Sequence, residues 1–155
     1  MLFVAKASKS DGFRKWLIEQ LPTLTVSAQE RESLMDSLAT TADAAQLQAL
    51  FQQVRSQFGS NKVNGSVAAG LVNRITDHSA KRNLRAAEAD TAVPSWWKEV
   101  ASQNDPAAKA LQQSLVLAAG RWQVNSMVAD VVAWIDRESA NATSDSEVGI
   151  ANSIE

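Results

Sequence analysis

Three observations on this chain of 155 residues predict an all-α fold. Apolar residues recur at three- and four-residue intervals over several segments, and no segment alternates apolar with polar residues as a half-buried strand does. The composition is 45% hydrophobic and 21% charged without cysteine, which is typical of a globular core that needs no disulfide. We expect a single-domain helical bundle of about five to six helices with a long C-terminal helix.

The N-terminal part is predicted to form three amphipathic helices. The first runs from about Ser10 to Leu21. The second begins after Ser27, whose hydroxyl can form a capping box with Glu30. The third follows Asp43 and is closed by Gly59, which can adopt the left-handed conformation common at helix ends.

The remaining chain is predicted to form three further helices. One runs from about Ser66 to Ala89, and a short one starts at Pro94. Asp105 caps the last helix, which extends to about Ser139 and would be roughly 50 Å long. No internal repeat is found at the periods typical of helical solenoids.

We expect residues 1–140 to form the helical bundle domain and residues 141–155 a polar, acidic tail without fixed structure. No apolar run reaches the length of a membrane-spanning helix, and the first residues lack the features of a secretion signal. The sequence therefore predicts a soluble, intracellular and cytoplasmic protein without a membrane partner.

A basic band is the most distinctive charge pattern. At 100° per residue, five residues of the helix predicted over residues 66–89 fall within an arc of about 100°; they are Arg74, His78, Lys81, Arg82 and Arg85. Residues 44–87 hold six lysines or arginines, Arg55 and Lys62 among them, and one acid, Asp77, although the whole chain has a formal net charge of -2. A solvated helix face with local ion pairs explains the same pattern.

The adjacent residues Trp96 and Trp97 point about 100° apart on a helix. Either the short helix is wedged between neighbours, which buries both side chains, or one of them is an exposed anchor for a partner. The other three tryptophans, Trp16, Trp122 and Trp134, lie at helical spacing with apolar residues and are predicted to be in the core.

The sequence indicates no catalytic residue, metal site or cofactor. His78 is the single histidine, no G-x-S-x-G elbow accompanies it, and cations occupy the helical positions around it where metal ligands would lie. The loop from Gly59 to Ser66 lacks the ending of a phosphate-binding loop. We therefore expect a non-enzymatic protein, and no small-molecule substrate is identified.

Two hypotheses for the function stay open. The first is binding of nucleic acid through contacts of the basic band with phosphates, by a structural subunit that self-assembles like a coat protein. The second is a protein–protein interaction module, such as an adaptor, chaperone or inhibitor, anchored by Trp96 and Trp97 with the basic band facing an acidic partner. Both hypotheses are compatible with a homo-oligomer.

Overall fold

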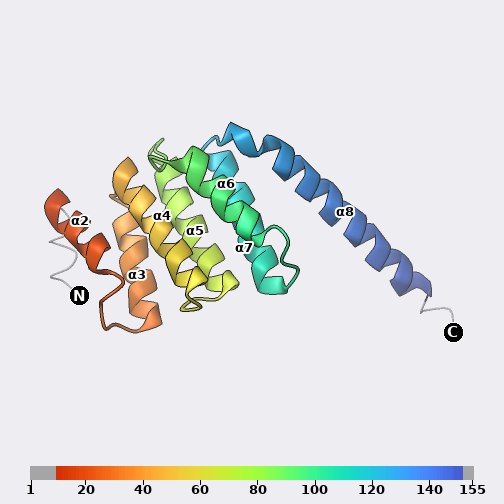
Figure 1. Cartoon of the computed structure of the whole chain (residues 1–155), viewed down its shortest axis with the longest axis horizontal. Helices are drawn as coiled ribbons and strands as arrows, with labels where there is room; N and C mark the ends of the chain where they lie inside the picture. The colour runs from red at the N-terminus through yellow and green to blue at the C-terminus, as the bar shows by residue number, and fades with distance from the viewer. Residues whose placement is uncertain (1–9, 152–155) are drawn as a thin grey trace. The chain divides into compact units, whose positions relative to one another are not determined.

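Seven α-helices and one 3₁₀-helix form the part of the chain that the computed structural model describes, residues 10–151 for the backbone and 10–140 for the side chains (Figure 1). They are α2 (Asp11–Gln20), α3 (Ala28–Ala39), α4 (Ala44–Gly59), α5 (Gly65–Ala80), α6 (Ala89–Val100), α7 (Pro106–Arg121), η1 (Asn125–Met127) and α8 (Val128–Ala151). The all-α prediction is confirmed, with seven α-helices in place of five to six. The chain divides after Val124 into an N-terminal unit and a C-terminal unit.

The sequence signals for helix starts are confirmed at three places. The Ser27 hydroxyl accepts a hydrogen bond from the Glu30 N–H at 3.2 Å, and the Glu30 carboxylate accepts one from the Ser27 N–H at 2.9 Å. This capping box holds the pKa of the Glu30 carboxyl below its ordinary value, because the backbone bond favours the charged form. Asp43 caps α4 together with Gln46, and Asp105 caps α7.

Three helices end in the same way, at a residue other than glycine with a positive φ. Asn61 follows α4, Asn83 follows α5 and Gln123 follows α7, with φ angles of 56°, 54° and 54°. The next N–H in each case donates to the carbonyl five positions earlier, over 2.8–2.9 Å. Gly59, predicted to adopt this conformation, does not do so, since no glycine in the described residues has a positive φ.

The helix predicted to reach Ala89 ends at Ala80, because Asn83 adopts the left-handed conformation that asparagine tolerates better than most residues. Residues 81–88 form turns that lead into α6. Since α6 already begins at Ala89, Pro94 lies inside this helix and not at its first position.

The long helix predicted from Asp105 to Ser139 is interrupted. α7 ends at Arg121, and the chain turns at Gln123 between two buried side chains, Trp122 at 1% and Val124 at 3% exposure. A straight continuation of α7 would not keep both Trp122 and Val124 buried in the N-terminal unit.

The tail expected over residues 141–155 lies partly within α8. The backbone of residues 141–151 is helical, which differs from the expected lack of fixed structure, and residues 152–155 lie outside the described residues. The proposed domain boundary at residue 140 stays a prediction.

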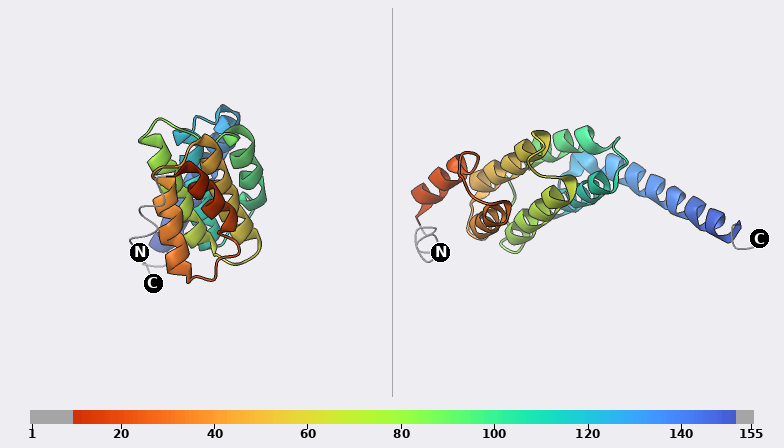
Figure 2. Two further views of the ribbon diagram at one scale, coloured as in Figure 1. Left: turned by 90° about the vertical axis from the view of Figure 1, so that its left-hand side faces the viewer. Right: turned by 90° about the horizontal axis from the view of Figure 1, so that it is seen from below.

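The N-terminal unit is a helical bundle of two layers (Figure 2, right). One layer contains α2, α4 and α6, and the other contains α3, α5 and α7. Each helix contacts its neighbours within its own layer, while α4 with α5 and α6 with α7 pack across the layers. Consecutive helices thus alternate between the layers, which is the arrangement of stacked helical hairpins in solenoid proteins.

Hydrogen bonds within the layers reveal a structural repeat. Asn73 donates to Ser114 across α5 and α7, 41 positions apart, and His78 contacts Asp36 across α5 and α3, 42 positions apart. Two further contacts have nearly the same step, Arg82 with Ala39 at 43 positions and Arg55 with Ser95 at 40 positions. The fold therefore repeats even though no repeat was found in the sequence.

The repeat escapes sequence comparison because burial recurs while residue types change. Trp122 follows Ser79 by 43 positions, and the same step maps every buried residue of α5 onto a buried residue of α7 or its cap. Val72 in α5, for example, corresponds to Leu115 in α7. The size of the side chain changes in both directions between equivalent positions, since Ser79 corresponds to Trp122 but Ile75 corresponds to Ala118.

The contact of α5 with α7 is the most extensive helix–helix contact in the described residues, and small residues make it close. A Cβ atom added at Gly65 would lie 2.3 Å from the carbonyl oxygen of Ala107. At the other end of the contact, the Trp122 indole donates to the Ser79 hydroxyl at 2.7 Å. The two helices therefore run parallel and are fixed at both ends.

An aromatic cluster connects three helices of the two layers. The Phe51 ring of α4 lies 5.2 Å from the Trp96 ring of α6 and 5.3 Å from the Trp122 ring, measured between centroids. All three side chains are at most 1% exposed. Edge and tilted ring contacts add about 0.5–1.5 kcal/mol per pair to the free energy of burial.

Gly65→Ala is expected to destabilise the protein by about 1–3 kcal/mol, since backbone atoms of α7 occupy the added Cβ position and the helices must separate. Gly70→Ala is the matched control on the same helix, because a Cβ there meets nothing within 4 Å. We expect the free energy of unfolding of this control to rise by about 0.5–1 kcal/mol, because alanine has a better helix propensity than glycine. Urea denaturation measures both, and effects of the same sign would contradict the close contact.

Trp122→Phe is expected to lower the free energy of unfolding by about 1–3 kcal/mol more than Trp96→Phe does. Both changes remove a similar volume from the aromatic cluster, but only Trp122 loses a hydrogen bond, whereas the buried Trp96 N–H has no hydrogen-bond partner. Thermal or denaturant unfolding of the two variants compares these costs. Equal losses would show that the indole N–H groups do not determine the difference.

Candidate interaction surfaces

The basic band does not form one helical face. Arg74 and His78 lie on α5, whereas Lys81, Arg82 and Arg85 follow the end of this helix. The calculated arc of about 100° assumed helical geometry throughout, so it holds only for the first two residues. The predicted face is therefore wrong in its geometry, while a role of these residues in nucleic acid binding stays a prediction.

Four of the five basic residues form ion pairs or hydrogen bonds with oxygen atoms of this chain. The contacts are Lys81 Nζ with Asp77 Oδ2 at 2.7 Å, His78 Nε2 with Asp36 Oδ1 at 3.1 Å, Arg82 Nη2 with the Ala39 carbonyl at 2.9 Å, and Arg85 with Asp90. Outside the band, Arg55 pairs with Glu99. Asp36, Asp90 and Glu99 lie outside residues 44–87, so the local charge count did not include them.

Arg74 is the exception within the band. Its side chain is exposed, and no ion pair involves it within residues 10–140. Lys62 is likewise exposed. The positive potential that these residues offer a partner is thus much smaller than the sequence count indicates, because exposed charges that are already paired contribute little at a distance.

Asp77 links the basic band to α7. Its carboxylate accepts a hydrogen bond from Lys81 and lies 3.9 Å from the Arg121 guanidinium. The Lys81 hydrogen bond, with further attraction from Lys81, Arg121 and His78, holds the pKa of the Asp77 carboxyl below its ordinary value. Arg121 also donates to the Thr76 hydroxyl at 2.9 Å, which fixes the end of α7 against α5.

Asp77→Asn is expected to reduce stability at pH 7 but not in strong acid. Because the folded-state pKa of Asp77 is lowered, its contribution is present above the unfolded-state pKa and is lost as the pH falls below about 4. The stability difference between wild type and variant, measured by urea denaturation from pH 7 to 2, should therefore shrink toward zero. Asp130→Asn is the control, since Asp130 is exposed and makes no ion pair in the described region. A difference that is independent of pH would contradict this role.

The tryptophan pair is buried. Trp96 is 0% and Trp97 is 4% exposed, so both side chains are buried as the wedged interpretation expects, while a role of the pair in binding a partner stays a prediction. Trp122 is buried as predicted, whereas Trp16 is 50% exposed against the prediction and packs on Phe13 in a tilted arrangement with 5.6 Å between ring centroids. Trp134 is half-buried in the C-terminal unit.

The described residues contain no group of three or more histidine, cysteine or carboxylate side chains that could hold a metal ion. Within the same part of the chain, no helix has the length and apolar character needed to cross a membrane. The expectation that the protein is not an enzyme stays a prediction.

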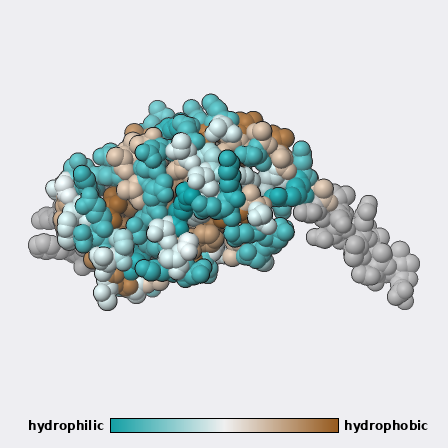
Figure 3. Space-filling model, in the orientation of Figure 1, coloured by the Kyte–Doolittle hydropathy of each residue, from teal (hydrophilic) through white to brown (hydrophobic). Residues whose placement is uncertain are grey.

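An exposed apolar stripe on α8 was missed by the sequence analysis. Val128, Val132 and Ile135 are 59%, 52% and 48% exposed and follow each other by one helical turn. Figure 3 shows hydrophobic side chains gathered at the surface over the first turns of α8. The spacing that usually identifies a core face here identifies a face that is about half exposed within the described residues.

Acidic residues border this stripe. Asp136 and Glu138 lie about 80° to either side of Val128 on the helical wheel. Residues 125–155 hold six acids and one arginine, so the C-terminal part of the chain is acidic. A partner that covers the stripe therefore needs an apolar surface with positive charge beside it.

The layer of α3, α5 and α7 presents such a surface. Leu117 on α7 is 49% exposed and follows the exposed Arg74 of α5 by the step that also separates Trp122 from Ser79. Because α5 and α7 run parallel in contact, Arg74 and Leu117 lie at the same level on neighbouring helices. An apolar side chain and a cation without an ion pair are thus side by side.

No known protein family, no characterised protein and no solved structure matches this chain.

Proposed function

We propose that this chain is a non-enzymatic protein-interaction module that assembles through α8. The exposed stripe of Val128, Val132 and Ile135 carries the proposal. Full burial of an aliphatic side chain contributes about 1.5–3 kcal/mol, and these three side chains are already about half covered, so docking adds roughly 1 kcal/mol from each. Large exposed apolar surfaces with a polar border are typical of binding sites.

A second copy of the chain is the partner that fits this stripe. The stripe has acidic borders, and the Arg74–Leu117 surface combines an apolar residue with a free cation. An α8 helix that docks on this surface of another copy would bring Ile135 toward Leu117 and Asp136 toward Arg74. Because the two surfaces differ, the contact is heterologous and can extend into a ring or a filament.

Binding of nucleic acid is the second candidate. Arg74, Lys62 and Lys81 are exposed and would make phosphate contacts. Against it stand the ion pairs of Lys81, His78 and Arg85 within the fold. The exposed apolar residue beside Arg74 also favours a protein partner over a bare phosphate backbone.

Sedimentation equilibrium of the full chain tests assembly. We expect the wild-type mass to rise with concentration and Val132→Lys to weaken association roughly tenfold or more, because it places a charge in the apolar interface. Ala133→Lys is the matched control, since this neighbouring exposed residue lies outside the stripe. A wild-type protein that is monomeric at all accessible concentrations would refute the proposal.

Charge reversal identifies the docking surface. Arg74→Glu is expected to weaken association several-fold, and Asp136→Arg in the same chain should restore it, because the pair is reversed rather than removed. Failure of the second change to restore association would exclude this docking geometry while leaving the role of α8 intact. The ratio of absorbance at 260 and 280 nm in the same samples reports bound nucleic acid, and a high ratio that Arg74→Glu with Lys81→Glu abolishes would favour the second candidate.

A further inference from the structure

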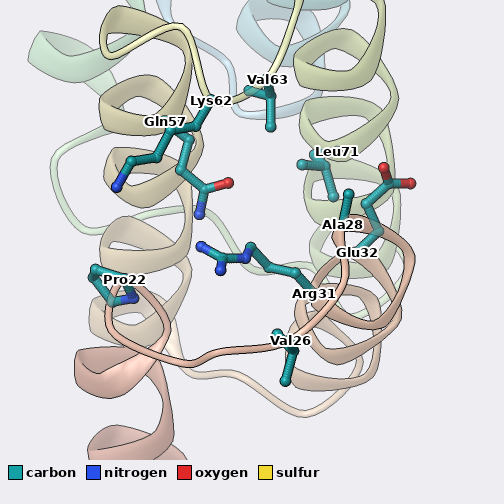
Figure 4. A pocket seen from close by; sticks show the side chains of 9 residues that line it. All are labelled: Pro22, Val26, Ala28, Arg31, Glu32, Gln57, Lys62, Val63 and Leu71. Atoms are coloured by element: carbon teal, nitrogen blue, oxygen red, sulfur yellow. The ribbon is translucent and has the colours of Figure 1, made fainter.

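A cavity of about 300 Å³ lies between α3, the segment before it, and the α4–α5 connection (Figure 4). Its volume is at the lower end of the range for small-molecule sites. The cavity belongs entirely to the N-terminal unit and is lined by none of the residues of the Arg74–Leu117 surface or of the α8 stripe. The cavity is therefore separate from the two surfaces proposed for assembly.

Two hydrogen-bond donors face each other across the cavity. Gln57 is 97% buried, its side-chain nitrogen has no hydrogen-bond partner, and Figure 4 shows this nitrogen pointing toward the guanidinium of Arg31. One arm of this guanidinium donates to the Leu24 carbonyl at 2.9 Å, which holds the group in place. A buried donor without an acceptor destabilises the fold, so an acceptor between the two groups is strongly favoured.

The local charge favours an anion as this acceptor. Lys62 adds a second cation to the lining. The one acid of the lining, Glu32, extends away from Arg31 in Figure 4 and does not pair with it. Arginine presents a planar fork of N–H groups that matches a carboxylate with two parallel hydrogen bonds.

The remaining wall is apolar. Val26, Val63 and Leu71 line the cavity together with Ala28 and Pro22. These side chains offer nothing to the oxygens of a fully polar anion such as inorganic phosphate, but they can bury a short hydrocarbon chain. The lining thus combines one group of donors that can bind an anion with an apolar compartment.

We propose that the cavity between α3 and α4 binds a small organic carboxylate, with its carboxylate between Arg31 and Gln57 and its apolar chain against Val26, Val63 and Leu71. The Gln57 amide and the Arg31 guanidinium donate to the carboxylate, and Lys62 attracts it at the rim. Binding satisfies the buried amide nitrogen and neutralises the guanidinium in one step.

Isothermal titration calorimetry of the full chain with octanoate at pH 7 tests this site. Octanoate is expected to bind, whereas inorganic phosphate, which lacks the chain, and 1-octanol, which lacks the charge, should each bind at least tenfold more weakly. Phosphate binding as tight as octanoate binding would overturn the role of the apolar wall, and equal binding of octanol would overturn anion recognition. Absence of octanoate binding would overturn the site.

Variants locate the binding in this cavity. Gln57→Glu keeps the shape of the side chain but replaces the donor with a carboxylate that repels the anion, and it should weaken octanoate binding roughly tenfold to hundredfold. Arg31→Gln should have a similar effect, and Lys62→Gln, at an exposed position that does not support the fold, should weaken binding about twofold to fivefold. Lys98→Gln on α6 is the control, since it removes an exposed cation that does not line the cavity. Thermal unfolding confirms that each variant is folded, and octanoate binding that is unchanged in Gln57→Glu and Lys62→Gln would overturn the proposal.

Discussion

The close parallel contact of α5 with α7 is the constraint on which the rest of the N-terminal unit depends. Gly65 allows the backbones to touch at one end, and the Trp122 indole fixes the other end on Ser79. Trp122 also belongs to the aromatic cluster with Phe51, so the same side chain joins this layer to α4. Any change that separates α5 from α7 therefore disturbs both layers, because the core of one layer is built on the other.

The repeated helix endings explain how this contact arises. An asparagine or glutamine with positive φ ends α4, α5 and α7, and after α4 and α5 the chain crosses to the other layer. Each crossing places a new helix about one step of 40 to 45 positions after its neighbour in the same layer. Stacking of such hairpins produces a layered fold from local turns, without any similarity of sequence between the repeats.

Local chemistry made the starts of helices predictable, while their ends and the charge pattern depended on distant residues. Ser27, Asp43 and Asp105 carry their capping signal in the adjacent sequence. Asn83 has no comparable signal, because asparagine adopts the left-handed conformation only where the following chain is held by tertiary contacts. The count of positive charge in the basic band was misleading for the same reason. Its balancing acids, Asp36 and Asp90, are brought to it by packing, and a count along the sequence could not include them.

Periodicity also cannot distinguish a face that the chain covers from a face that another molecule covers. Val128, Val132 and Ile135 have the spacing of a core stripe, and a sequence of one chain contains no information on which surface meets it. The structure makes the distinction through the exposure of the stripe compared with that of the other apolar side chains. Within residues 10–140 most large apolar side chains are buried, whereas the three side chains of the stripe are about half exposed. The acidic borders of the stripe then restrict which partner fits. A partner with a cation beside an apolar residue gains free energy from both apolar burial and electrostatic attraction. A purely apolar surface gains only the first, and an acidic surface gains neither.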